Sequence, residues 1–237
     1  MPTATSSTNH HVVDKAVKVQ IVTDGGAALD AKVIGTDAKT DLALLKVDGR
    51  ADFPFVDLAD SKPRVGEWVV AMGNPFGLGG TVTAGIVSAH GRNIGAGPYD
   101  DFLQIDAPVN KGNSGGPTFN TRGEVVGVNT AIFSPSGGSV GIAFAVPAGT
   151  VKAVVSQLKT SGQVERGWLG VQVQTMTPEM ADSLGLDSAT GALVAEAQAG
   201  SPAAAAGLKS GDVITQLGKA RVEDGRDLAR KVRRDRS

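Results

Sequence analysis

The sequence predicts a mainly β protein of two domains, and three observations lead to this prediction. Residues 17–147 contain many short runs rich in β-branched residues, separated by Gly, Pro, Asn and Asp. No helical period interrupts these runs, which favours a barrel or a sandwich. Beyond Pro147 one helical segment appears, and short strand-like runs then return. We therefore expect a β domain over residues 1–147, a linker helix over 148–165 and a small domain over 166–237.

Composition limits the classes of function. The 237 residues are 41% apolar and 20% charged, as in an ordinary globular protein with a sizeable core. A net charge of -1 does not favour nucleic acid or an anionic membrane surface as a partner. The absence of cysteine excludes disulfides, thiol catalysis and cysteine metal sites. There is no long apolar run and no signal-peptide pattern at the start, so neither membrane insertion nor a signal peptide is predicted.

The strands of the first domain follow one another with turn residues between them. Residues 17–22 and 31–35 alternate apolar and polar side chains around an Asp-Gly turn, which is typical of a hairpin. The further expected strands cover residues 41–47, 67–73, 81–88, 101–105, 124–133 and 141–146.

One amphipathic helix is expected between the two domains. Its apolar residues recur at helical spacing at Val151, Val154, Val155 and Leu158. Gly162 lies just past the end, where a helix cap is expected. From residue 167 onward short strands return, interrupted by an Ala-rich stretch at residues 201–211.

The segment "VNKGNSGGPTFN" surrounds a single hydroxyl, Ser114, with Gly112, Gly115 and Gly116. A glycine-rich loop leaves backbone amides free to face one point, and beside a serine they can stabilise the oxyanion of an acyl transfer. The same residue types also build ordinary β-turns, so the loop alone leaves both interpretations open. A phosphate loop is disfavoured because no Lys follows the glycines and no helix begins there.

A serine nucleophile needs a base, and the base needs a carboxylate that orients it. The chain has three histidines, His10, His11 and His90, and the first two directly precede the first hairpin. Asp41 stands at the entrance to a mostly apolar strand, where a carboxylate needs a partner. The order His, Asp, Ser together favours nucleophilic catalysis over three unrelated turn residues.

Several long motifs resemble the HtrA/DegP family of serine endopeptidases (peptidase Do-like). They are "TNHHVV", "TDLALLKV", "VGEWVVAMGNPFGLGGTVTAGIVS", "GNSGGP" and "GEVVGVNTAIFSPSGGSVGIAFAVP". The resemblance implies a chymotrypsin-like double β-barrel followed by a PDZ domain. It implies His11 as general base, Asp41 as the acid that orients it and Ser114 as nucleophile. His10 then becomes a neighbour of the base, and His90 matches no catalytic position and is expected in a loop.

The resemblance also places the substrate cleft. The residues implied for the oxyanion hole and for substrate binding are Gly112, Asn113, Ser114, Thr130, Ala131 and Ile132. Main-chain pairing along residues 130–132 implies broad substrate choice. Ile132, with Ile142 or Phe144, would wall an apolar pocket for small aliphatic side chains.

The second domain resembles a bacterial PDZ domain through "RGWLGV" and "GALVAEAQAGSPAAAAGLKSGDVI". Its implied carboxylate loop consists of Trp168, Leu169, Gly170 and Val171. The strand over residues 171–174 would accept a peptide C-terminus by β-augmentation, and a helix over residues 224–232 would form the other wall.

The chain departs from its family at both ends. Ten residues precede His11, where the family has a strand pair, an export signal and an oligomerising arm, and the PDZ-like part stops after its groove helix. We therefore expect a truncated chain, with a first barrel that lacks its first strands and a PDZ domain that lacks its last strand. Lys111 stands where many relatives have Pro.

The resemblance implies an ATP-independent serine endopeptidase that degrades unfolded or misfolded envelope proteins in the periplasm. Its implied partners are unfolded polypeptides and peptide C-termini, and it implies a homotrimer although the arm is absent. No cofactor or metal is expected. The alternatives are an inactive fragment that holds apolar segments as a chaperone-like module, and a stand-alone peptide-binding PDZ protein.

Overall fold

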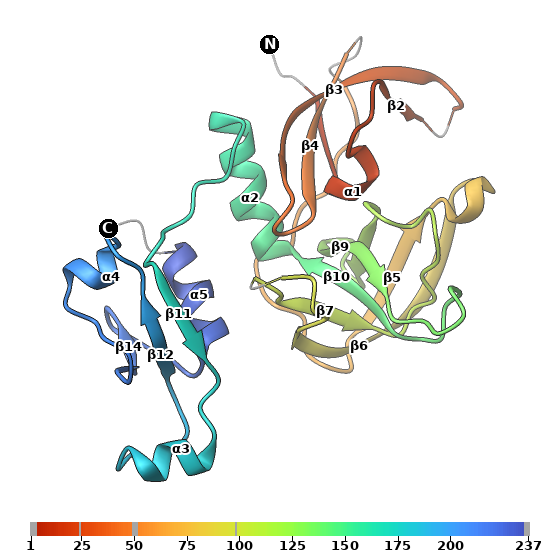
Figure 1. Ribbon diagram of the computed structural model, residues 1–237. Coiled ribbons are helices and arrows are strands. Elements are labelled where there is room, and N and C mark those ends of the chain that lie inside the picture. Colours follow the sequence, from red (N-terminus) through yellow and green to blue (C-terminus); the bar gives the residue numbers. More distant parts are fainter. Residues whose placement is uncertain (1–3, 24, 49–51, 98, 235–237) are drawn as a thin grey trace. The chain divides into compact units, whose positions relative to one another are not determined.

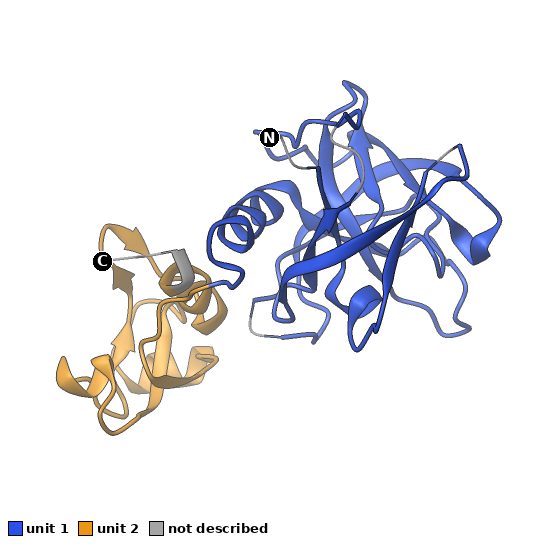
Figure 2. Ribbon diagram, turned by 90° about the horizontal axis from the view of Figure 1, so that it is seen from above, with its two compact units in different colours: residues 1–164 blue, residues 165–237 orange. Residues whose placement is uncertain are grey.

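The computed structural model describes residues 4–23, 25–48, 52–97 and 99–234. The chain forms two compact units, Met1–Val164 and Glu165–Ser237 (Figure 2). Strands dominate the first unit and sheets also organise the second (Figure 1), which confirms the predicted mainly β class. No helix within the described ranges is long and apolar enough to cross a membrane.

The first sheet carries four antiparallel strands in the order β1-β4-β3-β2. Its elements are β1 (Thr5–Thr8), α1 (His10–Val13), β2 (Val19–Val22), β3 (Ala28–Asp37) and β4 (Leu42–Val47). Side chains alternate between the faces of a strand, and β4 is buried on both faces. Leu42 and Leu44 join one apolar cluster, whereas Ala43 and Leu45 pack with Val13 of α1. This double burial fixes the turn before β4, which holds Asp41.

The second sheet is a closed barrel with the strand order β10-β7-β6-β5-β8-β9. Its elements are β5 (Trp68–Gly73), the 3-10 turn η1 (Pro75–Gly77), β6 (Thr81–Arg92), β7 (Phe102–Ile105), β8 (Pro117–Asn120), β9 (Val125–Ile132) and β10 (Ala143–Pro147). Small and β-branched side chains such as Val69, Ala71 and Val87 fill its interior. Because the sheet is closed into a barrel, functional residues are expected on the loops at the ends of the barrel.

Helix α2 (Ala148–Ser161) belongs to the first unit (Figure 2). The predicted apolar positions Val151, Val154 and Leu158 are buried in a cluster with residues of β4 and β9, and Val155 is partly buried there. Gly162 ends the helix in the left-handed conformation with φ 73°, and its amide donates to Leu158 O at 3.0 Å. The helix is thus a packed part of the first unit.

The second unit contains a three-stranded sheet in the order β11-β12-β13 and a small hairpin, β14-β15. Its elements are β11 (Val171–Gln174), α3 (Pro178–Ser183), β12 (Ala192–Ala197), α4 (Pro202–Ala205), β13 (Val213–Ile214), β14 (Gln216–Leu217), β15 (Ala220–Arg221) and α5 (Gly225–Arg234). Ala192, Val222 and Leu228 form the buried centre of its core. In this order β11 is an outer strand of its sheet.

Candidate active site

His11 and Asp41 form a hydrogen-bonded pair on the first unit. His11 Nδ1 lies 2.6 Å from Asp41 Oδ2, and the His11 backbone N–H donates to Asp41 Oδ1 at 2.9 Å. The carboxylate therefore holds both the ring and the backbone of the histidine. The two side chains are 50% and 21% exposed, so the pair contributes little to stability. What it fixes is the ring orientation, with Nε2 left to act on another group.

A buried amide, Asn9, also holds this pair, a role that was not predicted from the sequence. Asn9 is fully buried, and its Nδ2 donates to Asp41 O at 2.9 Å and to Thr130 Oγ1 at 3.0 Å. It thereby joins the acid of the pair to strand β9. Its place directly before α1 suggests a helix cap, yet its side chain makes no capping hydrogen bond.

Ser114 lies in a tight loop, here called the serine loop (residues 110–116), before β8. Asn113 N donates to Asn110 O at 3.1 Å, and Gly115 N donates to Asn129 O of β9 at 2.8 Å. Gly112 and Gly115 have φ of +99° and +85°, which favours glycine at both positions. A Cβ on Gly112 would lie 2.2 Å from Asn74 O, and one on Gly115 would lie 2.2 Å from Thr8 Oγ1. Glycine is therefore required on both sides of the serine.

Two backbone amides close to the Ser114 hydroxyl have no acceptor within the described part of the fold. Among the described residues the amides of Asn113 and Gly115 donate within the fold, whereas those of Gly112 and Ser114 have no acceptor. Amides that flank a hydroxyl without an internal partner can bind an oxyanion. The Ser114 hydroxyl donates to Thr130 O at 3.4 Å, so its hydrogen-bond partner in this structure is β9 and not His11.

The end of β9 offers a free edge beside Ser114. Its ladder with β8 runs from Val125 to Val128, so residues 130–132 extend beyond β8 while Ala131 and Ile132 pair with β10. Thr130, Ala131 and Ile132 are half-buried there. Such a free strand edge can accept an extended peptide.

Two side chains are placed differently from the expectation. Phe144 is 7% exposed and packs edge-on against Phe102 at a centroid distance of 6.4 Å, so it fills the core and cannot wall a substrate pocket. His90 is an exposed residue of β6 and not of a loop, because β6 continues to Arg92.

The predicted carboxylate loop of the second unit lies directly before β11. Gly170 has φ +73°, and a Cβ there would lie 2.2 Å from Ser201 Cβ. Leu169 O accepts from Ala203 N at 3.0 Å, which ties the loop to α4, and Trp168 is 59% exposed. Beside β11, Gly225 at the start of α5 approaches Val173 so closely that a Cβ would lie 2.6 Å from its Cγ2. The start of helix α5 therefore packs directly against strand β11.

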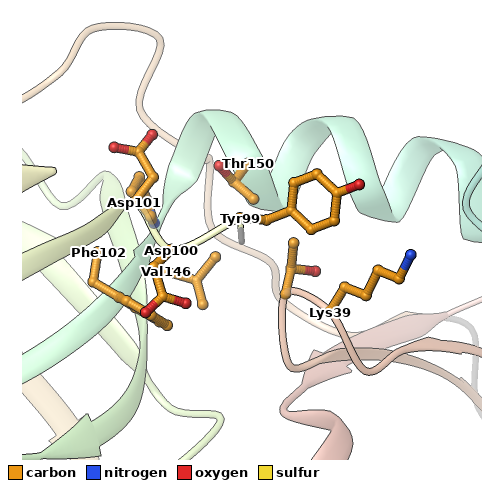
Figure 3. Close-up of a pocket in the computed structure, with 9 residues that line it drawn as sticks. Lys39, Tyr99, Asp100, Asp101, Phe102, Val146 and Thr150 are labelled. Carbon is orange, nitrogen blue, oxygen red and sulfur yellow. The ribbon is translucent and has the colours of Figure 1, made fainter. Parts of the chain in front are cut away.

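Figure 3 shows a small pocket elsewhere on the first unit, between the turn before β4, the segment before β7 and the start of α2. Lys39 Nζ lies 5.6 Å from the centre of the Tyr99 ring, and Thr150 approaches from the helix. Its volume of about 20 Å³ is enough for about one water molecule, so it does not suit a peptide. Within the described ranges no group of three His, Cys, Asp or Glu residues could hold a metal ion.

Comparison with known proteins agrees with the two-unit fold. Residues 7–128 match the model of the trypsin-like peptidase domain, and residues 167–237 match that of the PDZ domain. The fold and the site thus define a trypsin-like peptidase domain followed by a PDZ domain.

The relatives narrow the class further. The chain is 63% identical over 226 residues to a probable periplasmic serine endoprotease DegP-like of Rhizobium meliloti, which covers 95% of this chain and 45% of that protein. It superimposes on the HtrA-type protease AlgW with tripeptide with a TM-score of 0.91 at 44% identity, covering 100% of this chain and 79% of that one. A serine endoprotease from Yersinia pestis follows with a TM-score of 0.75 at 34% identity, covering 97% and 75%.

The chain belongs to the HtrA/DegP family of serine endoproteases. It spans about half the length of the curated relatives that it matches.

Proposed function

We propose that this chain is a serine endopeptidase in which Ser114 is the nucleophile, His11 the general base and Asp41 the residue that orients the base. The observation that carries the proposal is the 2.6 Å pair of His11 and Asp41 on the same unit as a serine flanked by two unengaged amides. Asp41 accepts a hydrogen bond from His11 Nδ1–H, and the ring therefore presents Nε2 as a proton acceptor.

The reaction follows from these groups. Ser114 Oγ attacks the carbonyl carbon of the scissile peptide bond while His11 Nε2 takes its proton. The negative charge on the carbonyl oxygen is bound by the amides of Gly112 and Ser114, and Asn113 shapes the loop between them. The C–N bond then breaks, His11 returns the proton to the leaving amine, and water hydrolyses the ester on Ser114 by the same steps.

Substrate pairing is proposed along residues 130–132. Thr130 O accepts the Ser114 hydroxyl in this structure. A substrate N–H that binds this carbonyl would compete with the serine, and the hydroxyl would then turn toward His11. Recognition by main-chain groups suits a broad range of extended, unfolded polypeptides.

The second unit is proposed to bind peptide C-termini. Amides of the loop that contains Leu169 and Gly170 would receive the carboxylate, and β11 would pair with the peptide. Two AlgW structures that this chain resembles are described as complexes with a decapeptide and a tripeptide. Since several relatives are named periplasmic endoproteases, we propose a role in degrading unfolded envelope proteins, with assembly into trimers.

The decisive test is turnover of a chemically unfolded model protein by the purified chain. Ser114→Ala should abolish cleavage and also labelling by a fluorophosphonate, while circular dichroism stays unchanged. Ser156→Ala, which changes an exposed serine of α2, is the matched control and should keep full activity. Cleavage that persists in Ser114→Ala would refute the assignment, and a folded parent chain that never cleaves would favour the holding module instead.

A further inference from the structure

The 3-10 turn after β5 exposes two large apolar side chains. Phe76 is 67% and Leu78 82% exposed. Phe76 also has φ 56° and ψ 15°, a left-handed conformation that bulky residues rarely adopt. Strain of this kind is concentrated at functional sites, where the surrounding structure holds it in place. An exposed aromatic ring in a strained backbone conformation needs an explanation.

Hydrogen bonds within this segment, here called the apolar turn (residues 74–79), hold its backbone in place. Gly77 N donates to Asn74 O at 3.2 Å, and Leu78 N donates to Pro75 O at 3.1 Å. Gly79 N donates to Asn74 Oδ1 at 2.7 Å. Since these bonds fix the backbone on both sides of Phe76, the two apolar side chains are presented on a defined scaffold.

The apolar turn is attached to the serine loop at the end where the oxyanion amides begin. Asn74 N donates to Gly112 O at 3.2 Å, and Phe76 N donates to Lys111 O at 3.0 Å. Strand β9 is attached at the opposite end of the same loop, where Gly115 N donates to Asn129 O. Ser114 therefore lies between β9 on one side and the apolar turn on the other.

The order of these attachments along the serine loop indicates in which direction a bound polypeptide runs past Ser114. In the proposed function the residues before the scissile bond pair with β9. A polypeptide that crosses Ser114 from β9 must continue toward Lys111 and Gly112. The residues after the scissile bond, which leave with the amine, then reach the apolar turn.

We propose that the apolar turn is a specificity subsite for the leaving-group side of the substrate, in which Phe76 and Leu78 contact the first residues after the scissile bond. This inference rests on the proposed function. It narrows the substrate class to segments with large apolar side chains beyond the cleaved bond, which are buried in folded proteins and exposed in unfolded ones. Partial burial of one such side chain corresponds to a gain in kcat/KM of about tenfold.

The experiment uses two substrates with the same residues before the scissile bond. One is a peptide with Leu and Phe directly after the bond, and the other ends in a fluorogenic coumarin amide, so that no residue reaches the apolar turn. The variant is Phe76→Asn combined with Leu78→Ala, because Asn tolerates the left-handed conformation and keeps the turn folded. Phe55→Ala is the matched control, since Phe55 is 87% exposed and its segment bonds to the start of β9 through Asp57 and Val125.

We expect the double variant to lose about tenfold in kcat/KM on the peptide and less than about twofold on the coumarin amide. Phe76→Leu should restore most of the loss, and Phe55→Ala should leave both substrates unchanged. An equal loss on both substrates would show that the turn only supports the oxyanion loop, and no loss on either would show that the peptide does not touch it. Either result would contradict the inference about the apolar turn. The proposed function would still hold in both cases, provided that the parent chain cleaves the coumarin amide. If the parent cleaves neither substrate, both fail.

Discussion

Replacing Gly112 by alanine tests whether the serine loop is as tightly held as the structure shows. Gly112 has φ +99°, and a Cβ there would lie 2.2 Å from Asn74 O and 2.9 Å from Asn74 C. Both neighbours are backbone atoms, so no side chain can rotate away. Either the serine loop or the apolar turn must move by about 1 Å to restore an ordinary contact.

Two terms contribute to the expected loss of stability. The left-handed conformation costs an alanine about 1 kcal/mol, and overpacking against backbone adds about 1 to 3 kcal/mol. The same displacement should also slow catalysis. Moving an oxyanion donor by about 1 Å should lower kcat by roughly 100-fold or more, because the hydrogen bond to the oxyanion is lost.

Gly66→Ala is the matched control, because Gly66 has φ +88° and nothing within 4 Å of its Cβ position. Urea unfolding should therefore show only the conformational cost of about 1 kcal/mol for Gly66→Ala, with kcat on a short fluorogenic peptide unchanged. If Gly112→Ala kept kcat within about threefold of Gly66→Ala, the reasoning from the close approach of Asn74 would be refuted.

Three further predictions concern other contacts. Asn9→Ala should lower the free energy of unfolding by about 1 to 3 kcal/mol and reduce kcat more than it raises KM, because two buried hydrogen bonds to Asp41 and Thr130 disappear; an unchanged kcat in steady-state kinetics would contradict this. Gly170→Ala should weaken binding of a C-terminal peptide in a fluorescence titration while short-peptide cleavage persists, since its Cβ would collide with the Ser201 side chain and its φ of +73° disfavours alanine; unaltered peptide affinity would argue against the carboxylate loop. Burial raises the pKa of Asp227, but hydrogen bonds from Lys231 and from the Glu223 amide and the nearby positive charges outweigh it, so the pKa lies below its usual range. This stabilisation is complete above the unfolded pKa of about 3.9 and disappears as the pH falls through the folded pKa. Asp227→Asn should therefore have a lower melting temperature than the parent chain at pH 7, and the difference should be smaller at pH 2, as followed by circular dichroism. An equal difference in melting temperature at both pH values would disprove the linkage.

Much of the fold could be predicted because local patterns decide it. The spacing of Val151, Val154 and Leu158 fixed one face of α2, and all three are buried. The glycines beside Ser114 indicated a loop that needs left-handed backbone and bare amides, and Gly112 and Gly115 have positive φ. The order of His, Asp and Ser suggested a catalytic set, and the resemblance to the HtrA/DegP motifs implied His11 as the partner of Asp41, which lies 30 positions away and bonds to it.

Other features depend on contacts between distant segments and leave no local pattern. The amide of Asn9 joins two segments that lie 32 and 121 positions away, and in the sequence it is simply a polar residue before a short helix. The left-handed backbone of Phe76 could not be predicted either, because in this turn the sequence suggests a positive φ only at the neighbouring Gly77. The free end of β9 is likewise not visible in the sequence, because it exists only where the ladder with β8 stops at Val128.

The seating of α2 also bears on how such proteins can be assembled from parts in evolution. Leu158 is fully buried against residues of the first unit, and Gly35 of β3 lies so close to the end of the helix that a Cβ would meet Gly162 O at 2.2 Å. A recombination event that joined a new peptide-binding module at residue 147 would strip this helix away and open the apolar cluster beneath it. A junction after residue 164 leaves the cluster covered, so this is where modules can be exchanged while the peptidase unit keeps its fold.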